Sequence, residues 1–254
     1  MRRAVLALSL WALPLGAQAG DSPYVLYASG HYEDAIKAGE AAQDAPGLAI
    51  AARAALAEAM LRPQPCMECL ERAEGFASRA VEADPRYADG EVWLAAALGY
   101  ETRLTGPVQA RLEGKPARAK AALDMALQYD PANPYALAAL GGWHIEIVRL
   151  GGGFLARLIY GAEEAEGIAL FDRAAKAAPG NVAVHYQIAL SLAGYDRARF
   201  HDRIRSQLVA AATDPPATAY ERFMAGRAVE LLALLKAGDD AAFAQMVHRF
   251  QGYP

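Results

Sequence analysis

The chain has little positive charge, little cysteine and few β-branched residues. It carries 25 Lys and Arg against 29 Asp and Glu, a formal net charge of −4. We therefore expect no nucleic-acid partner, because neutralising phosphates requires a basic surface. Alanine dominates the apolar residues, which favours closely packed helices over sheets. After the first 20 residues, no unbroken apolar run is long enough to cross a bilayer.

Motifs for catalysis and metal binding are also missing. The glycines at 151–153 do not lead into the Gly-Lys-Ser/Thr that ends a phosphate-binding loop. His31, His185, His201 and His248 lack the spacing of metal ligands, and no Ser/His/Asp grouping stands in a nucleophile elbow. We therefore predict a protein that is not an enzyme and that holds no cofactor and no metal.

The first residues have the pattern of a secretory signal peptide. Two arginines at positions 2 and 3 precede an apolar run from Ala4 to Leu15, and small residues at 17 and 19 provide a cleavage site. The run is too short to span a membrane. We expect residues 1–19 to be removed and residues 20–254 to form one soluble domain that is exported to the periplasm.

An alanine precedes a proline by five residues at four places along the chain. Each pair closes an apolar helical pattern, and three of the prolines follow an aspartate. A proline cannot continue a helix and disfavours helical geometry in the residue before it, so each pair predicts a helix end and a turn. Such recurrence is typical of a helical-repeat array. The pairs are Ala80 and Pro85, Ala126 and Pro131, Ala174 and Pro179, and Ala210 and Pro215.

The residues between these turns supply helix starts and stops. Asn133 can cap a helix that has Pro134 at its first position, and Asn181 can cap the next leading helix. Near the end, Gly238 can stop one helix and Asp239 can cap the last one. We expect an all-α solenoid of about five helical hairpins, with residues 217–254 forming the capping helices.

Several of these positions resemble the tetratricopeptide-repeat (TPR) family. The segment Gly30–Ile36 is similar to that family's hairpin turn, Leu140-Gly141 to its first helix, and Phe171, Ala174 and Pro179 to its second helix and closing position. The resemblance covers most of residues 23–216. It implies a right-handed solenoid, TPR-like, whose members hold other molecules on their surfaces rather than catalyse reactions.

The repeat spacing departs from that family. Successive prolines are 46, 48 and 36 residues apart, against a usual unit of about 34 residues. The extra residues lie within hairpins, at 104–116 and 151–160, and we expect long loops there. Insertions of this kind often form the binding face of a repeat array. The second insertion is apolar, and such a segment is more often tucked against the array than exposed.

A fainter resemblance points to a second family. The segment 140–148, the glycines at 151–153, Tyr160-Gly161 and Phe171 are similar to the helical repeats of the regulator-of-microtubule-dynamics family. This resemblance implies the fold only.

Cys66 and Cys69 are the sharpest local feature. Two cysteines at i and i+3, opening a helix after a proline-rich loop, fit a disulfide that fastens the first turn. The same spacing occurs in redox Cys-x-x-Cys motifs, but the alternating strands and helices of a redox fold are missing. We expect a structural disulfide, with redox work and metal binding as the alternatives.

Aromatic and charged residues near the insertions are the candidate contacts for a partner or ligand. For His144, packing between hairpins competes with a role in binding. The residues at the first insertion can likewise form either a solvated hairpin end or a recognition surface. The candidates are Trp93, Tyr100, Arg103, Arg111, Trp143, His144, Glu146, Arg149, Phe154 and Tyr160.

These features support three hypotheses for function. The first is a non-catalytic scaffold or adaptor that binds a protein partner in the cell envelope. The second is a periplasmic small-molecule-binding helper of a transport system, in which Trp93, Trp143 and the insertions roof a pocket for an apolar ligand. The third is a redox protein that uses Cys66 and Cys69. Contact with a membrane surface is conceivable only if the segment 151–160 is exposed.

Overall fold

The computed structural model of the protein describes residues 21–64 and 66–254. Over these residues the chain forms thirteen α-helices and no strand, which confirms the predicted all-α class. The signal peptide predicted at 1–19 lies outside the described residues. The helices are α1 (Pro23–Ser29), α2 (Tyr32–Ala42), α3 (Ala45–Leu61), α4 (Met67–Ala83), α5 (Ala88–Thr105), α6 (Pro107–Leu112), α7 (Lys115–Tyr129), α8 (Pro134–Tyr160), α9 (Glu164–Ala177), α10 (Val182–Asp196), α11 (His201–Thr213), α12 (Ala219–Ala237) and α13 (Asp240–Phe250).

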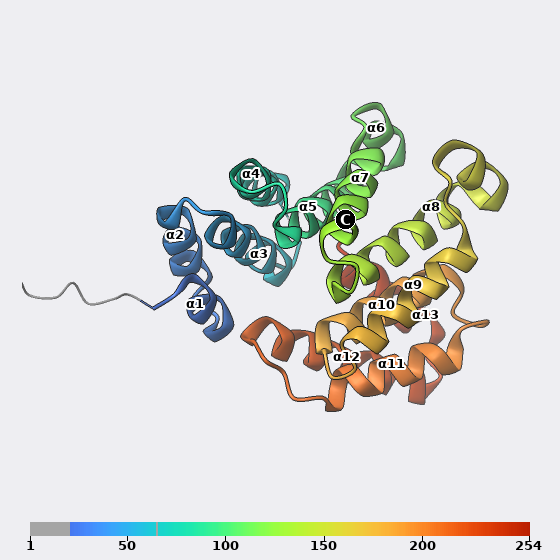
Figure 1. Ribbon diagram of the computed structural model, residues 1–254. Helices are drawn as coiled ribbons and strands as arrows, with labels where there is room; N and C mark the ends of the chain where they lie inside the picture. Colours follow the sequence, from blue (N-terminus) through green and yellow to red (C-terminus); the bar gives the residue numbers. More distant parts are fainter. Residues whose placement is uncertain (1–20, 65) are drawn as a thin grey trace, which may run out of the picture.

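The helices form two layers that follow a curve (Figure 1). Most helices pack on the next one along the chain, and a second set of contacts joins α3 to α5, α5 to α8, α8 to α10 and α10 to α12. The chain thus alternates between an inner layer (α3, α5, α8, α10 and α12) and an outer layer (α2, α4, α7, α9 and α11). A surface on the inner layer is therefore assembled from segments far apart in the sequence.

The four alanine–proline pairs end four outer helices in the same way. In each, the alanine carbonyl accepts a hydrogen bond from the amide of the residue before the proline, over 2.8–3.1 Å. Ala80, Ala126 and Ala174 are fully buried. Ala210, in the frame with the weakest pattern, is only half-buried. The constant five-residue spacing therefore marks the last turn of a helix and the start of the connection to the next hairpin.

The predicted helix caps are present. The Asn133 side chain accepts from the amides of Tyr135 and Ala136, with Pro134 at the first helical position, and Asn181 caps α10. Gly238 ends α12 in the left-handed conformation, and the Asp239 side chain caps α13. These starts and stops depend only on local sequence, which is why they can be predicted.

Small residues let the helices of a hairpin approach closely. In α8, a Cβ atom added at Gly141 would lie 2.7 Å from a ring carbon of Phe171 and 2.9 Å from the carbonyl oxygen of Gly167. Phe171 is fully buried. A glycine at 141 is therefore needed for the ring of α9 to lie flat against the backbone of α8.

The loops predicted at 104–116 and 151–160 are wrong, because both insertions are largely helical. α5 ends at Gly106 (φ 81°, ψ 160°), after which α6 begins at once. α8 turns at Gly152 (φ 70°, ψ 156°) and continues to Tyr160. Both glycines have a backbone conformation that is essentially restricted to glycine. Each insertion is thus a leading helix, a glycine turn and a short helix.

The last residues do more than cap the array. α12 returns to the first helix, where a Cβ atom added at Gly30 would lie 3.1 Å from that of Ala219. The Arg227 side chain donates to the Met60 carbonyl at the end of α3, over 3.4 Å. The C-terminus lies near the middle of the view in Figure 1. The array therefore curves far enough for its two ends to meet.

Candidate functional site

A cavity of about 660 Å³ lies on the inner side of the curve. Helices α1, α3, α5, α6, α7, α8, α10 and α12 contribute to its wall. Its volume is within the range of small-molecule sites, roughly 300–1,000 Å³. The wall is mostly apolar, and representative residues are Leu56, Met60, Leu123, Ile147, Leu150 and Met224.

Seven of the ten residues that the sequence suggested line this cavity. They come from α5, α6 and α8, so the structure brings together the two insertion regions that the sequence keeps about 40 residues apart. The seven are Trp93, Tyr100, Arg103, Arg111, Trp143, Glu146 and Tyr160.

The other three candidates, His144, Arg149 and Phe154, are not part of the cavity wall. His144 is buried, and its Nδ1 accepts from the backbone amide of Glu163 over 3.0 Å. Burial lowers the pKa of His144, which favours the neutral ring that this bond requires. His144 therefore packs between α8 and the start of α9.

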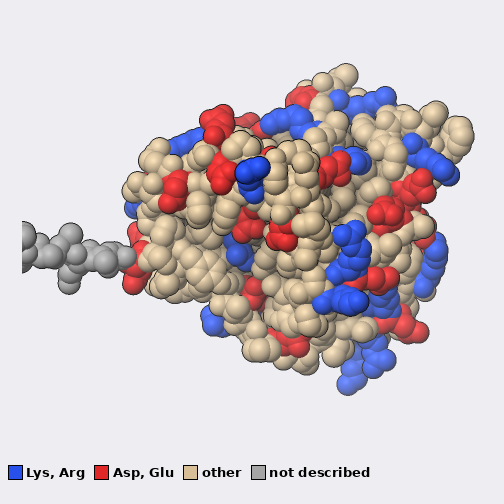
Figure 2. Space-filling view, in the orientation of Figure 1, with Lys and Arg blue, Asp and Glu red and all other residues tan. Residues whose placement is uncertain are grey.

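Two apolar tips border the mouth of the cavity. Val108 and Leu112 on α6, and Leu155 and Ile159 on α8, line the cavity and are also exposed. Beyond them, Phe154 is 79% exposed and Leu158 69% exposed, so the expectation that this segment is tucked in is wrong. Figure 2 shows both tips, at the upper right, as largely uncharged surface with basic groups beside them. The glycine turn at 152 carries this short helix out past the array.

Trp143 gives the cavity a rigid wall. Its indole nitrogen donates to the Pro116 carbonyl over 2.9 Å, and its ring meets that of Tyr160 edge-on with centroids 6.2 Å apart. The hydrogen bond joins Trp143 to the start of α7, and the ring contact joins it to the far end of α8. A ligand would therefore meet an indole that is already fixed in place.

Glu146 is held in a charged cluster beside the cavity. It accepts two hydrogen bonds from Arg149, over 2.7 and 2.8 Å, and a third from the hydroxyl of Tyr253. Burial alone would raise the pKa of Glu146, but these bonds and the positive charge of Arg103 hold it below its ordinary value. Tyr253 also stacks on His248 of α13, which places α13 beside this cluster.

Glu101 on α5 has the opposite environment. It is 1% exposed and its carboxylate lies 3.1 Å from the Lys115 nitrogen. Burial raises the pKa of Glu101 to about 7 in spite of that lysine, and the neighbouring Glu74 adds to the rise. Within the described residues, one of its oxygens has no hydrogen-bond partner.

The sequence analysis missed two charged residues of the wall, Glu221 in α12 and Arg53 in α3. Its guanidinium lies over three aromatic rings, at 4.6 Å from the centroid of Tyr27, 4.9 Å from Trp93 and 5.1 Å from Tyr135. It also donates to the Tyr135 hydroxyl over 3.2 Å. A lone arginine in a run of alanines, Ala49 to Ala59, was the available signal.

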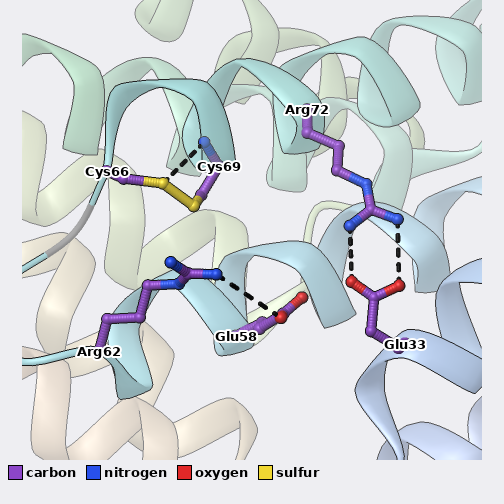
Figure 3. Close-up of a disulfide and its surroundings, with 6 residues drawn as sticks. All are labelled: Glu33, Glu58, Arg62, Cys66, Cys69 and Arg72. Carbon is purple, nitrogen blue, oxygen red and sulfur yellow. Dashed lines mark hydrogen bonds and ion pairs between the residues drawn. A yellow bond between two sulfur atoms is a disulfide. The ribbon is translucent and has the colours of Figure 1, made fainter.

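Cys66 and Cys69 form a disulfide at the start of α4 (Figure 3). The Cys66 sulfur also caps the helix, accepting from the Cys69 amide over 3.1 Å. Beside it, Arg72 pairs with Glu33 of α2 and Arg62 with Glu58 of α3. The disulfide lies on the outer layer, and neither cysteine is part of the cavity wall.

Across residues 21–64 and 66–254, no cluster of three or more His, Cys, Asp or Glu side chains is arranged to hold a metal ion. No helix in the same part of the chain is both long and apolar enough to pass through a bilayer.

The comparisons with known proteins identify a family. The model of the family described as regulator of microtubule dynamics protein 1-3 matches residues 32–196, about two thirds of the chain. The match begins at α2 and ends with α10, so it includes both insertions and most of the cavity wall. No curated protein matches the chain.

Proposed function

The chain belongs to the regulator of microtubule dynamics protein 1-3 family, and on that premise we propose that it binds a small apolar molecule in its inner cavity. The observation that carries this proposal is the cavity itself, about 660 Å³ with a mostly apolar wall. Apolar side chains that face a solvent-filled hollow gain free energy when a ligand displaces the water. The rigid indole of Trp143 adds a surface on which an apolar ligand can pack.

The position of the tryptophans provides a direct assay. The chain has three, and Trp93 and Trp143 both line the cavity. In a Trp11→Phe background, binding of the neutral probe N-phenyl-1-naphthylamine is expected to quench tryptophan emission and to raise probe emission. Energy transfer between the two requires the probe to lie within a few nanometres of the cavity wall.

A cavity-filling variant with a matched control tests the location. Gly99 lines the cavity, and a Cβ atom there meets nothing within 4 Å. Gly75, on the outer helix α4, is equally free of neighbours but lies away from the cavity. We expect Gly99→Leu to weaken probe binding at least tenfold and Gly75→Leu to leave it unchanged. Equal binding by the two variants would place the probe elsewhere and defeat the proposal.

A protein partner is the second candidate, and the exposed tips support it. Phe154 and Leu158 project from the end of α8, and large apolar side chains exposed together are typical of interaction surfaces. A photocrosslinking residue placed at 154 should then capture a discrete protein, and one at the exposed Val229 should not. Capture that persists unchanged in a Leu158→Asp variant would count against this role.

We also propose that the chain is exported as a TPR-like protein of the cell envelope and that it is not an enzyme. The support is the signal-peptide pattern at 1–19 and the disulfide between Cys66 and Cys69, since such bonds persist in oxidising compartments. A mature protein from the periplasm that begins at Gly20 would establish export. A disulfide that no cellular thiol reductant opens in the folded protein would rule out the redox alternative.

A further inference from the structure

Besides Glu221, Arg53 is the charged side chain of the inner wall near the first helix. It lines the cavity on α3, where its guanidinium lies within 5.1 Å of the centroids of Tyr27, Trp93 and Tyr135. A guanidinium carries five N–H donors in a planar fork. The hydroxyl of Tyr135 accepts from one of them, over 3.2 Å. This partner is uncharged.

Arg53 lacks the counterion that other arginines of the molecule have. Arg72, Arg79, Arg118 and Arg149 each lie within 2.8 Å of a glutamate oxygen. Within the described residues, Arg53 has no carboxylate at ion-pair distance.

The acid that influences Arg53 is Glu221, at the start of α12. Glu221 also lines the cavity, and one of its oxygens accepts from the Ala217 amide over 2.7 Å, so part of its acceptor capacity is used at the start of its own helix.

A cation removed from water without a counterion costs free energy. The three aromatic rings offset part of that cost through cation–π contacts. An anion bound from solution would supply the missing charge, and the planar fork of an arginine suits a carboxylate or a phosphate group. The wall around Arg53 therefore favours an anionic group at one end of a mostly apolar site.

We propose that Arg53 is the anion subsite of the cavity, and that its ligand is an amphiphile with an anionic head group and an apolar tail. The inference rests on the proposed function, that the cavity holds an apolar molecule. The head lies at Arg53 on α3, and the tail follows the apolar wall past Trp143 toward the tips of α6 and α8. Figure 1 shows α3 on one side of the array and these tips on the other.

Four twelve-carbon ligands separate the head group from the tail. Dodecanoate, dodecyl phosphate, dodecanol and dodecylamine each compete with the neutral probe N-phenyl-1-naphthylamine. We expect at least one of the two anions to bind ten times more tightly than dodecanol, and the amine to bind most weakly. The stronger of the two anions identifies the head group as carboxylate or phosphate. Equal affinity for anion and alcohol would overturn the proposal, without any need for a variant.

Substitutions then locate the anion. In Arg53→Gln, the affinity for the preferred anion should fall at least tenfold, while that for the neutral probe stays within twofold. Arg111→Gln is the matched control, because Arg111 also lines the cavity but lies at the exposed tip of α6. Loss of anion preference in Arg111→Gln and not in Arg53→Gln would move the subsite and contradict the assignment.

The same experiment distinguishes a failure of the proposed function from a failure of the role of Arg53. If the neutral probe fails to bind the unmodified protein, the proposed function fails. If the probe binds and the anions show no preference, the apolar cavity stands and only the role of Arg53 is wrong.

Discussion

The two insertions are built alike although their sequences differ. In the first, α5 reaches Gly106 and α6 follows; in the second, α8 turns at Gly152 and continues as a short helix. The two glycines differ by 11° in φ and 4° in ψ (81° and 160° against 70° and 156°). Both short helices end in exposed apolar side chains at the mouth of the cavity. The same backbone conformation at a glycine, rather than a shared sequence motif, creates the two tips.

The leading helices beneath these tips differ in how tightly they are packed, and this predicts the largest effect. Leu-Gly occurs in both, at 98–99 in α5 and at 140–141 in α8. We expect Gly141→Ala to lower the free energy of unfolding by about 3 kcal/mol, because the new Cβ clashes with Phe171 and a backbone oxygen. Gly99→Ala should raise it by up to about 1 kcal/mol. Urea denaturation of both variants measures the difference.

The glycine turns predict the next effect. Because alanine cannot easily adopt the conformation of Gly106 or Gly152, each glycine-to-alanine change should cost about 2 kcal/mol or detach the short helix that follows. Hydrogen exchange distinguishes the two results, since a detached helix loses protection over 107–112 or 153–160. A large loss of stability or protection in one variant and none in the other would show that the two glycine turns are not equivalent.

The buried glutamates of the two helices predict opposite dependences on pH. Because the pKa of Glu101 is raised to about 7, its stabilising effect is fully present below its ordinary pKa and is lost as the pH rises toward 7. The pKa of Glu146 is lowered, so its effect is present above the ordinary pKa and is lost on acidification. The trend from Glu101 should amount to at least about 1 kcal/mol.

Glutamine variants isolate the two trends. Glu101→Gln should remove the decline in stability between about pH 4.5 and 7, and Glu146→Gln should flatten the loss below pH 4.5. Thermal unfolding across pH 3–8 records both curves. Identical curves of stability against pH for the two variants would mean that the surroundings of Glu101 and Glu146 do not control how these glutamates ionise.

The tips predict the smallest effect on stability. Phe154→Ser with Leu158→Ser, and Val108→Ser with Leu112→Ser, should each change the free energy of unfolding by less than about 0.5 kcal/mol, because these side chains are already in solvent. Chemical denaturation checks this, with the buried Phe171→Ala as the contrast, expected to cost about 3–5 kcal/mol.

The sequence predicted the features that depend on neighbouring residues. Asn133 before Pro134, Gly238 before Asp239 and the four alanine–proline pairs each specify a helix end within a few positions. The helical nature of the insertions was missed, because the residues in excess of the usual repeat length were interpreted as loops. Gly106 and Gly152 turn the chain without preventing a helix directly after them.

The site was predicted only where its residues cluster in sequence. Trp143, Glu146 and Tyr160 stand close together on one helix, and they were identified. Arg53 was missed because its partner Tyr135 is 82 residues away and its own helix is apolar apart from Arg53 and Glu58. Tyr253 was missed because its contact with Glu146 spans 107 residues. Pairings of that range follow from the curvature of the array, which no local pattern contains.

The contacts of Gln251 and Tyr253 set an order in which the protein can be completed. Gln251 donates to the Leu190 carbonyl in α10, and Tyr253 reaches Glu146 and Arg149 in α8. During synthesis both residues are made after the helices that they touch. The charged cluster of α8 therefore stays incomplete until Tyr253 has been added, more than a hundred residues of translation after Glu146.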